Sequence, residues 1–373
     1  MRAPRRVVVV HSRVGGGHVS AAQALATEFE ATGRCEALVV DAYVDYGRFP
    51  VTRFPRIYAS LARRHPRLWS AVYYTSARRF IDPAHIVGPF LRSGFRRMVT
   101  SYEPELVVSA LPVVNGLLAD ALRPLAARLE VVLTDWNLVH PFWVARGVDH
   151  YTAPTDSARQ DCIRYGALPE VVDVVGIPVR REFGAPTNRA EVRARRLSGL
   201  GLDTNGFTLL AMAGAEGSPR TLINLARLAT ADLSGQLIVI CGNNVELRCR
   251  LERLPTRIPV RALGFVDDVA DLMSAADVLV TKAGGVTLAE GFSRGVAVVI
   301  HDVLPGQETG NLDYVLRHGA AEFAPNGSAL VEIVARLESD PEHRAGLAER
   351  GARLGRPDAA RHIAANVLQR AGF

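Results

Sequence analysis

A histidine behind a run of glycines is the first group in the chain that could do acid–base chemistry. His18 follows Gly15–Gly17, in a loop that comes after an apolar run. Neutral imidazole near pH 7 can take the proton of a hydroxyl that attacks an electrophilic carbon. Asp135 follows another apolar run and could orient such a base or act as the base itself. The alternative for His18 is structural, with the ring capping the next helix or bonding a loop carbonyl.

A second glycine turn, Ala283–Gly285, is suited to binding an anion. Glycine lets the backbone turn tightly and approach a ligand, and the following residues 286–294 carry apolar side chains at helical spacing. Unpaired N–H groups and the helix dipole favour negative charge at a helix start, where a diphosphate is the natural guest. Glu290 could accept hydrogen bonds from a ribose diol, or it could be a solvated helix residue. Lys282, the only lysine, could contact a phosphate or stand there by chance.

The elements that must hold these groups are parallel strands and helices. Three short apolar runs are rich in β-branched residues, as buried parallel strands are: Val7–Val10, Asp277–Thr281 and Val296–Ile300. The order strand, glycine loop, helix is typical of the start of a doubly wound α/β sheet. A dinucleotide site would need the spacing Gly-x-Gly-x-x-Gly, which is absent from the first loop, so we exclude NAD and FAD.

The segment 48–97 has an unusual composition, with eleven arginines, nine aromatic residues and a single acidic residue. Such a mixture could stack on nucleic acid bases, bind an anionic membrane surface, or form amphipathic helices packed on a domain with a solvated basic face. We favour the membrane for the exposed part and no nucleic acid partner, because no nucleic-acid fold signature accompanies the segment. The residues we assign to this surface are Arg63, Arg64, Arg67, Trp69 and Tyr73.

Length and composition indicate a globular protein of two domains. A chain of 373 residues is too long for one ordinary core, and 48% apolar with 22% charged residues describes a soluble protein. The four cysteines show no metal-ligand or redox spacing, which we interpret as reduced thiols in a cytoplasmic protein. No stretch approaches the ~20 apolar residues of a membrane span. We therefore expect a cytoplasmic protein that lies on a membrane without crossing it.

The segment 264–311 resembles the nucleotide-binding half of the family 28 glycosyltransferases, within them the monogalactosyldiacylglycerol synthase and processive diacylglycerol glucosyltransferase branch. The matching pieces are Gly264–Val266, Thr281–Gly284, Thr287–Glu290, Pro305–Glu308 and Asn311. The glycine loop with His18, the string 134–143 and the string 65–69 continue the resemblance over nearly the whole chain. Two departures are Gly285, where the family often has proline, and the glycine-rich loop at 214–218, where alanine stands at positions that are usually glycine.

The resemblance implies the GT-B fold, an α/β arrangement of two Rossmann-like domains whose parallel sheets face each other across a cleft. Residues 1–180 would bind the lipid acceptor, with the insertion 48–97; residues 181–345 would bind the UDP-sugar; and 346–373 would form a helix that returns to the first domain. His140 would lie on the acceptor side. The implied donor-binding residues are Gly17, Gly214, Glu216, Phe265, Val266, Lys282, Gly284, Gly285, Val286, Thr287, Glu290, Gln307, Glu308 and Asn311.

The reaction that the resemblance implies is transfer of galactose or glucose from a UDP-sugar to diacylglycerol, with inversion. His18, assisted by Asp135, would be the base, and the helix amides after Gly284 would stabilise the departing UDP. No DxD carboxylate pair stands at the second-domain loop, so we expect neither a metal nor another cofactor. The alternatives are a polyprenyl-linked or other hydrophobic acceptor, and a membrane-surface binding protein without activity. A nucleotide-sugar epimerase of the same fold is disfavoured because it has no use for the insertion.

Overall fold

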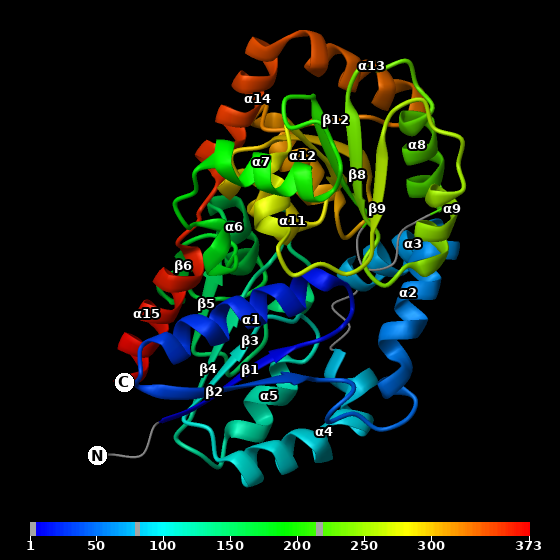
Figure 1. Ribbon diagram of the computed structural model, residues 1–373. Helices are drawn as coiled ribbons and strands as arrows, with labels where there is room; N and C mark the ends of the chain where they lie inside the picture. Colours follow the sequence, from blue (N-terminus) through cyan, green and yellow to red (C-terminus); the bar gives the residue numbers. More distant parts are fainter. Residues whose placement is uncertain (1–4, 79–82, 214–218) are drawn as a thin grey trace. The chain divides into compact units, whose positions relative to one another are not determined.

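The computed structural model describes residues 5–78, 83–213 and 219–373 (Figure 1). The chain divides into two compact units. Unit 1 comprises Met1–Arg181, Pro305–Gly310 and Arg356–Phe373, and unit 2 comprises Glu182–Leu304 and Asn311–Gly355. Each unit has its own sheet and its own apolar core, and the two are described separately below.

Unit 1 is built on a six-stranded parallel sheet with the strand order β2-β1-β3-β4-β5-β6. The strands are β1 (Arg5–His11), β2 (Cys35–Asp41), β3 (Leu106–Ser109), β4 (Arg128–Val132), β5 (His150–Ala153) and β6 (Val172–Val174). The run Val7–Val10 is completely buried, because helices cover both faces of the sheet. Side chains of successive strand residues point to opposite faces. A continuous apolar run therefore packs against helices on both faces of the sheet.

The helices of unit 1 are α1 (Gly16–Ala31), α2 (Phe54–Arg64), α3 (Pro66–Arg78), α4 (Pro83–Tyr102), α5 (Asn115–Leu122), α6 (Asp156–Arg164) and α15 (Ala359–Ala371). Four of them pack against the two faces of the sheet at β1. Val7 and Val9 pack in one cluster with residues of α1 and α15. Val8 and Val10 pack in another cluster with residues of α4 and α5. The alternation along β1 therefore places α1 and α15 on one side and α4 and α5 on the other.

The last helix, α15, is joined to the sheet of unit 1 by a buried ion pair. Arg370 donates two hydrogen bonds to the carboxylate of Glu130 on β4, at 3.1 and 2.8 Å, and one to Asp173 on β6 at 2.9 Å. Glu130 is fully buried, and such a carboxylate is tolerated only with a partner. The stretch 346–373 is not one helix, because it contains the end of α14 (Pro341–Leu354) in unit 2 as well as α15.

Unit 2 repeats the design with the strand order β12-β11-β10-β7-β8-β9, again all parallel. Its strands are β7 (Thr208–Met212), β8 (Gln236–Ile240), β9 (Val260–Leu263), β10 (Val278–Lys282), β11 (Ala297–Asp302) and β12 (Glu322–Phe323). Its helices are α7 (Arg189–Gly199), α8 (Pro219–Ala229), α9 (Val245–Glu252), α10 (Val269–Ala275), α11 (Gly285–Arg294), α12 (Thr309–Arg317, which begins in the 305–310 segment of unit 1), α13 (Gly327–Ser339) and α14.

Helix α11 lies unusually close to β10 because it contains a glycine at the contact. A Cβ atom on Gly291 would stand 2.8 Å from Cδ2 of Leu279, so no other residue fits there without a shift. Val278 and Val280, on the opposite face of β10, pack instead in the cluster that contains residues of α8 and α13. The turn between β10 and α11 is therefore held by close packing on the sheet.

These two units confirm the predicted fold class of two Rossmann-like α/β domains with parallel sheets. Among helices within the described ranges, none combines the length and the apolar content that crossing a membrane requires. The segment 48–97, where amphipathic helices were one alternative, contains α2, α3 and the start of α4.

Candidate active site

His18 lies in the first turn of α1 and is buried, with 8% of its surface exposed. The helix starts behind Gly15, whose φ of 82° is in the left-handed region that favours glycine. Nδ1 of His18 lies 2.8 Å from the carbonyl oxygen of Ala110 and 3.4 Å from Oγ1 of Thr134. A carbonyl can only accept, so Nδ1 carries the hydrogen and donates it. Nε2 is therefore the ring atom that can accept a proton.

The protonation state of His18 is set by its burial. Burial lowers its pKa to about 4, although the bond to the Ala110 carbonyl acts in the opposite direction and the neighbouring His11 adds a smaller lowering. The imidazole is therefore neutral at pH 7, with its Nε2 lone pair available. A neutral imidazole of fixed tautomer is the form that a general base needs.

Asp135 is connected to the His18 side chain through a tryptophan. Nε1 of Trp143 donates to Oδ2 of Asp135 at 3.1 Å. The Trp143 side chain is fully buried, and its ring centroid lies 6.1 Å from that of His18. The partner of His18 Nδ1 is Ala110, a residue that the sequence analysis did not single out. Any residue offers a carbonyl, so no pattern in the sequence could have identified it.

His140 differs from His18 because both of its ring nitrogens bond to protein atoms. It caps a short 3-10 helix, Pro141–Trp143, where its Nδ1 accepts a hydrogen bond from the Phe142 amide at 3.2 Å. Its Nε2 therefore carries the hydrogen and lies 3.1 Å from Oγ of Ser76 and 3.3 Å from the carbonyl of Tyr73. Burial lowers the pKa of His140 to about 4. The ring thus joins the 135–143 loop to α3.

The segment 305–310 brings predicted donor residues into contact with α2 and α3. The hydroxyl of Tyr58 donates to Oε1 of Gln307 at 2.6 Å. Gly306 has a φ of 92°, and a Cβ atom there would lie 2.8 Å from Cδ1 of Tyr73. Glu308 is 9% exposed. Gln307 and Glu308 therefore belong to unit 1, whereas Asn311 belongs to unit 2.

The second glycine turn forms the start of α11 as expected from its sequence. Gly284 precedes the helix with extended backbone angles, φ −70° and ψ 126°, and Gly285 is the first helical residue. The side-chain amide of Asn311 donates to the Ala283 carbonyl at 3.0 Å and so ties α12 to the turn. Val286 is buried and Thr287 is half-buried. The turn thus places the first amides of α11 at the carboxyl edge of the sheet.

Glu290 is buried in α11, with 5% of its surface exposed. The alternative of a solvated helix glutamate is therefore wrong. Lys282 ends β10 at the same edge of the sheet and is half-buried. Removing a carboxylate or an ammonium group from water costs free energy unless the group pairs with another protein group or with a ligand.

The remaining predicted residues are exposed or half-buried, or they lie outside the described part. Phe265 is 72% exposed and Val266 is half-buried, directly after β9. The ring of Trp69 packs edge-on against Tyr58, with centroids 4.7 Å apart. Gly17 and Tyr73 are half-buried, whereas Arg64 and Arg67 are exposed. Gly214, Glu216 and the side chain of Arg63 lie outside the described residues.

No metal cluster is present in residues 5–78, 83–213 and 219–373, because no three His, Cys, Asp or Glu side chains there are grouped to hold an ion. The cysteines are all free thiols: Cys35, Cys162, Cys241 and Cys249. Burial raises the pKa of Cys162 to about 12 and that of Cys241 to about 11, so both are inert thiols at neutral pH.

Two family models match the chain, one over each half. The model described as monogalactosyldiacylglycerol (MGDG) synthase matches residues 18–179. The model described as glycosyl transferases group 1 matches residues 212–354. The first match begins at His18 and includes the string 134–143, and the second includes the turn 283–285.

Curated relatives match over most of this chain. A probable monogalactosyldiacylglycerol synthase of Glycine max is 28% identical over 372 residues, which is 95% of this chain and 69% of the relative. Monogalactosyldiacylglycerol synthase 1 of Arabidopsis thaliana is 29% identical over 347 residues, covering 89% of this chain and 64% of the relative. The chain therefore spans about two thirds of the length of these relatives.

Solved structures share the fold over the whole chain. MurG of Acinetobacter baumannii has a TM-score of 0.63 at 15% identity and covers 98% of this chain and 100% of its own. Anabaena Alr3699/HepE, solved in complex with UDP and glucose, has a TM-score of 0.61 at 14% identity with the same coverage. These likenesses confirm the predicted GT-B fold.

Proposed function

We propose that this chain, which is similar to monogalactosyldiacylglycerol synthases, moves a hexose from a UDP-sugar to diacylglycerol. The product is a β-glycosyl diacylglycerol, formed with inversion at the anomeric carbon. Unit 1 binds the acceptor, diacylglycerol, and unit 2 binds the donor, the UDP-sugar. The chemistry needs a base for the acceptor hydroxyl and a site that stabilises the leaving UDP.

The state of His18 is the observation that carries the proposal. Its Nδ1–H bond to the Ala110 carbonyl fixes the tautomer, and burial keeps the ring neutral. Nε2 can therefore take the proton of the diacylglycerol hydroxyl as oxygen attacks the sugar. Asp135 is a positioning residue in this account, because it holds Trp143 beside the base. His140 positions the same loop through its bonds to α3.

The turn before α11 supports the donor half of the proposal. The first amides of α11 follow Gly284, where a leaving diphosphate gains hydrogen bonds and the favourable end of the helix dipole. Glu290 binds the ribose hydroxyls, and Lys282 contacts a phosphate oxygen. The amides act on charge that develops as UDP leaves, so a metal ion is not required for this role.

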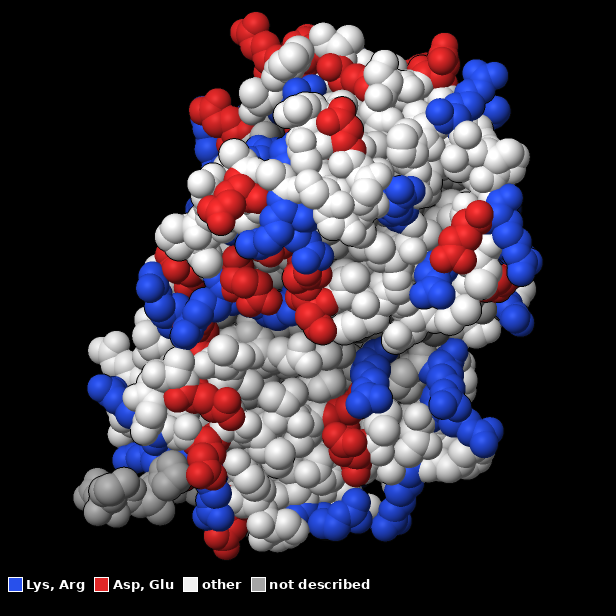
Figure 2. Space-filling model, viewed as in Figure 1, with Lys and Arg blue, Asp and Glu red and all other residues white. Residues whose placement is uncertain are grey.

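The exposed faces of α2 and α3 support binding to an anionic membrane. Ile57, Leu68 and Val72 are large apolar side chains that are 52%, 55% and 47% exposed. Arg64 and Arg67 are exposed at the junction of the two helices. Figure 2 shows blue basic side chains beside uncharged surface in the region of α2. Apolar side chains with arginines next to them suit the headgroup region of anionic lipids.

The experiment that tests the proposal is UDP release from a panel of UDP-sugars, with and without diacylglycerol in anionic vesicles. Release that requires both one sugar donor and the lipid is the expected result, and it identifies the sugar. Turnover only with a polyprenyl-linked or other hydrophobic acceptor would replace diacylglycerol in the proposal. Vesicle binding without turnover of any donor would contradict an enzymatic function.

A further inference from the structure

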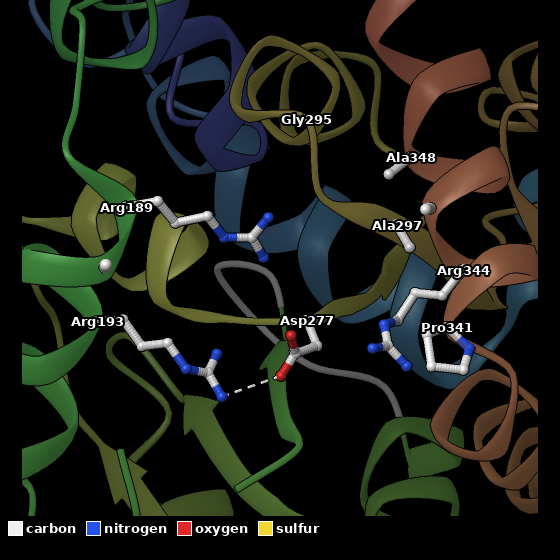
Figure 3. A pocket seen from close by; sticks show the side chains of 10 residues that line it. Arg189, Arg193, Asp277, Gly295, Ala297, Pro341, Arg344 and Ala348 are labelled. Carbon is white, nitrogen blue, oxygen red and sulfur yellow. Dashed lines mark ion pairs between the residues drawn. The ribbon is translucent and has the colours of Figure 1, made fainter. Parts of the chain in front are cut away.

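A cavity of about 490 Å³ lies at the amino ends of the strands of unit 2. Asp277 directly precedes β10 and Ala297 is the first residue of β11, and both line the cavity. The walls come from α7 and α14, whose side chains reach in from opposite sides in Figure 3. The glycine turn 283–285 lies at the carboxyl end of β10, so the cavity is at the other edge of the sheet.

The lining of this cavity carries an excess of positive charge. Arg189, Arg193 and Arg344 line it together with a single carboxylate, Asp277. Arg193 forms an ion pair with that carboxylate at 3.2 Å. Asp277 also accepts a hydrogen bond from the backbone amide of Thr208 at 2.8 Å. Within the described residues, no carboxylate oxygen lies within 4 Å of a nitrogen of Arg189 or Arg344. Two cationic groups are therefore left without a counter-charge.

Both of these arginines are held in place by uncharged partners. Arg189 donates to the carbonyls of Ser274 and Ala276, at 3.0 and 2.7 Å, where α10 ends. Arg344 bonds the Leu337 carbonyl, and its guanidinium lies over the ring of Phe207 at 5.1 Å from the centroid. A carbonyl fixes a guanidinium without cancelling its charge.

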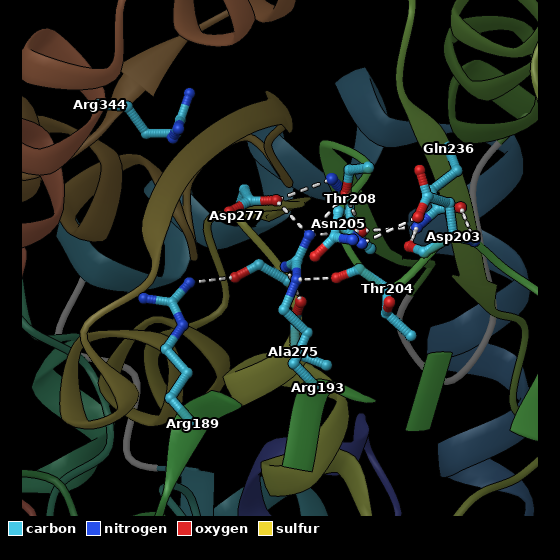
Figure 4. Close-up of polar contacts among 12 residues, drawn as sticks. Arg189, Arg193, Asp203, Thr204, Asn205, Thr208, Gln236, Ala275, Asp277 and Arg344 are labelled. Atoms are coloured by element: carbon cyan, nitrogen blue, oxygen red, sulfur yellow. Dashed lines mark hydrogen bonds and ion pairs between the residues drawn. The ribbon is translucent and has the colours of Figure 1, made fainter. Parts of the chain in front are cut away.

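Arginine side chains fixed in this way are suited to anions. A guanidinium has five N–H donors, and Arg189 uses two of them on these carbonyls. Its planar fork matches the oxygens of phosphate. Binding then costs little side-chain entropy, because the side chains are already ordered. Figure 4 shows Arg189 and Arg193 bonded to carbonyls at the end of α10, with Arg344 projecting from α14.

We propose that this cavity binds a small phosphorylated compound, at a site distinct from the donor turn. The rest of the lining is small and uncharged, which leaves room for the body of a ligand: Ala190, Gly295, Ala297, Pro341, Ala345 and Ala348. The volume falls within the range of about 300–1,000 Å³ typical of small-molecule sites. Arg189 and Arg344 bind the phosphate oxygens from two sides.

Helix α11 separates the two anion sites. It begins at Gly285 and ends at Arg294, and the next residue, Gly295, lines the cavity. A helix of this length spans roughly 15 Å at ~1.5 Å per residue, so one ligand cannot occupy both ends. The identity of the first site as a donor site rests on the proposed function, whereas the charge of the cavity does not depend on it.

The test is calorimetric titration of the full chain with inorganic phosphate and with glycerol 3-phosphate, in saturating UDP and at constant ionic strength. Arg189→Gln combined with Arg344→Gln should weaken phosphate binding at least about tenfold, since each lost charge-assisted bond is worth a factor of roughly ten or more. Arg261→Gln is the matched control, because Arg261 also bonds backbone carbonyls but lies outside the cavity. Equal affinity in the wild type and the double variant would overturn the proposal.

A second series protects the test against loss of folding in the double variant. Arg344→Lys keeps the charge without the fork, and Arg344→Met keeps only the aliphatic stem. Phosphate affinity should fall in the order wild type, lysine, methionine, while melting temperatures are compared in parallel. Identical affinity in all three, or displacement of phosphate by UDP, would contradict a separate site. UDP affinity is measured on its own, so a failed donor site is recognised independently.

Discussion

The two glycine turns of the molecule share one design and differ in what their helices carry. Each follows a buried parallel strand and opens a helix at the carboxyl edge of a sheet. The turn before α1 uses a glycine with φ 82°, and its helix carries the buried His18 in the first turn. The turn before α11 has no positive φ at Gly284, and its helix carries the buried Glu290 in the second turn.

The difference shows how the same local structure can serve two kinds of chemistry. In α1 the side chain in the first turn is a neutral imidazole with one defined acceptor atom, which suits proton transfer. In α11 the corresponding residue is Thr287, so the first turn offers backbone amides and a hydroxyl but no titratable side chain. In the proposed function, the position of one titratable side chain, and not the turn itself, separates the base site from the anion site.

Replacing the imidazole should have the largest effect. His18→Ala should lower the transfer rate by about 10²–10⁴-fold, the usual contribution of a general base, and leave UDP affinity unchanged. Initial rates of UDP release and calorimetric UDP binding measure the two quantities. His362→Ala, an exposed histidine on α15, is the control. Full transfer activity in His18→Ala would remove it as the base.

Changing the other turn should affect binding of the donor. Glu290→Ala should weaken UDP-sugar binding by about 1–3 kcal/mol, because a charge-assisted hydrogen bond is lost. Glu290→Gln keeps the size of the side chain and should lose less. Calorimetric titration with the donor gives the affinities, and melting temperatures check the fold. Donor affinity that is the same in wild type and Glu290→Ala would exclude Glu290 as a ribose ligand.

The pH dependence of stability should also distinguish the two turns. Burial lowers the pKa values of His18, His140 and His301 to about 4 in the folded chain. The unfolded chain therefore binds more protons between pH 4 and 6.5, so stability is complete above that window and falls as the pH decreases. The slope is at most about 1.4 kcal/mol per pH unit for each histidine.

Urea unfolding at several pH values between 4.5 and 7 measures this slope. His18→Asn should reduce it by at most about one third, since burial lowers the pKa of His11 as well as the pKa values of these three histidines. Thr287→Val, in the turn without a histidine, replaces no titratable group and should change it much less. An unaltered slope in His18→Asn would mean that the imidazole is not held neutral by the fold.

A smaller effect is expected where the 305–310 segment meets α2. Tyr58→Phe removes the hydroxyl that donates to Gln307 and should lower the free energy of unfolding by about 0.5–1.5 kcal/mol. A double-mutant cycle with Gln307→Ala isolates the pair. Additive effects of the two changes would show that this hydrogen bond contributes nothing to stability.

The smallest effect is expected on removal of metal ions. Helix amides and Lys282 stabilise the leaving diphosphate in this account, so EDTA should change the transfer rate by less than about twofold. Rates measured after dialysis against EDTA, and again after addition of Mg²⁺ or Mn²⁺, check this. A large loss that either ion restores would contradict donor stabilisation by the α11 turn alone.

Much of the framework could be predicted from local sequence. Two apolar runs are recognised as strands, Val7–Val10 and Asp277–Thr281. The first lies inside β1, and the second is offset by one residue from β10. The glycine turns could be predicted because glycine adopts backbone angles that other residues avoid. It also lets the backbone come close to a neighbouring group. The resemblance to a family added the order of the motifs, which no single turn could provide.

The contacts that define the site could not be predicted in the same way. The partner of His18 is a carbonyl 92 residues away, and Gln307 meets a tyrosine 249 residues away. Such pairs are set by how strands and helices pack, which periodicity does not encode. The same holds for His140, whose bonds to α3 depend on the path of a loop. The cavity with Arg189 and Arg344 likewise joins segments far apart in the chain.

The stereochemistry of the product tests the central claim most directly. Direct attack by an acceptor hydroxyl that His18 deprotonates inverts the anomeric carbon, so a UDP-α-hexose must give a β-linked glycolipid. The proton NMR coupling between H1 and H2 of the purified product measures this. A large diaxial coupling is the predicted result, and a small coupling, which indicates an α linkage, would contradict the role assigned to His18.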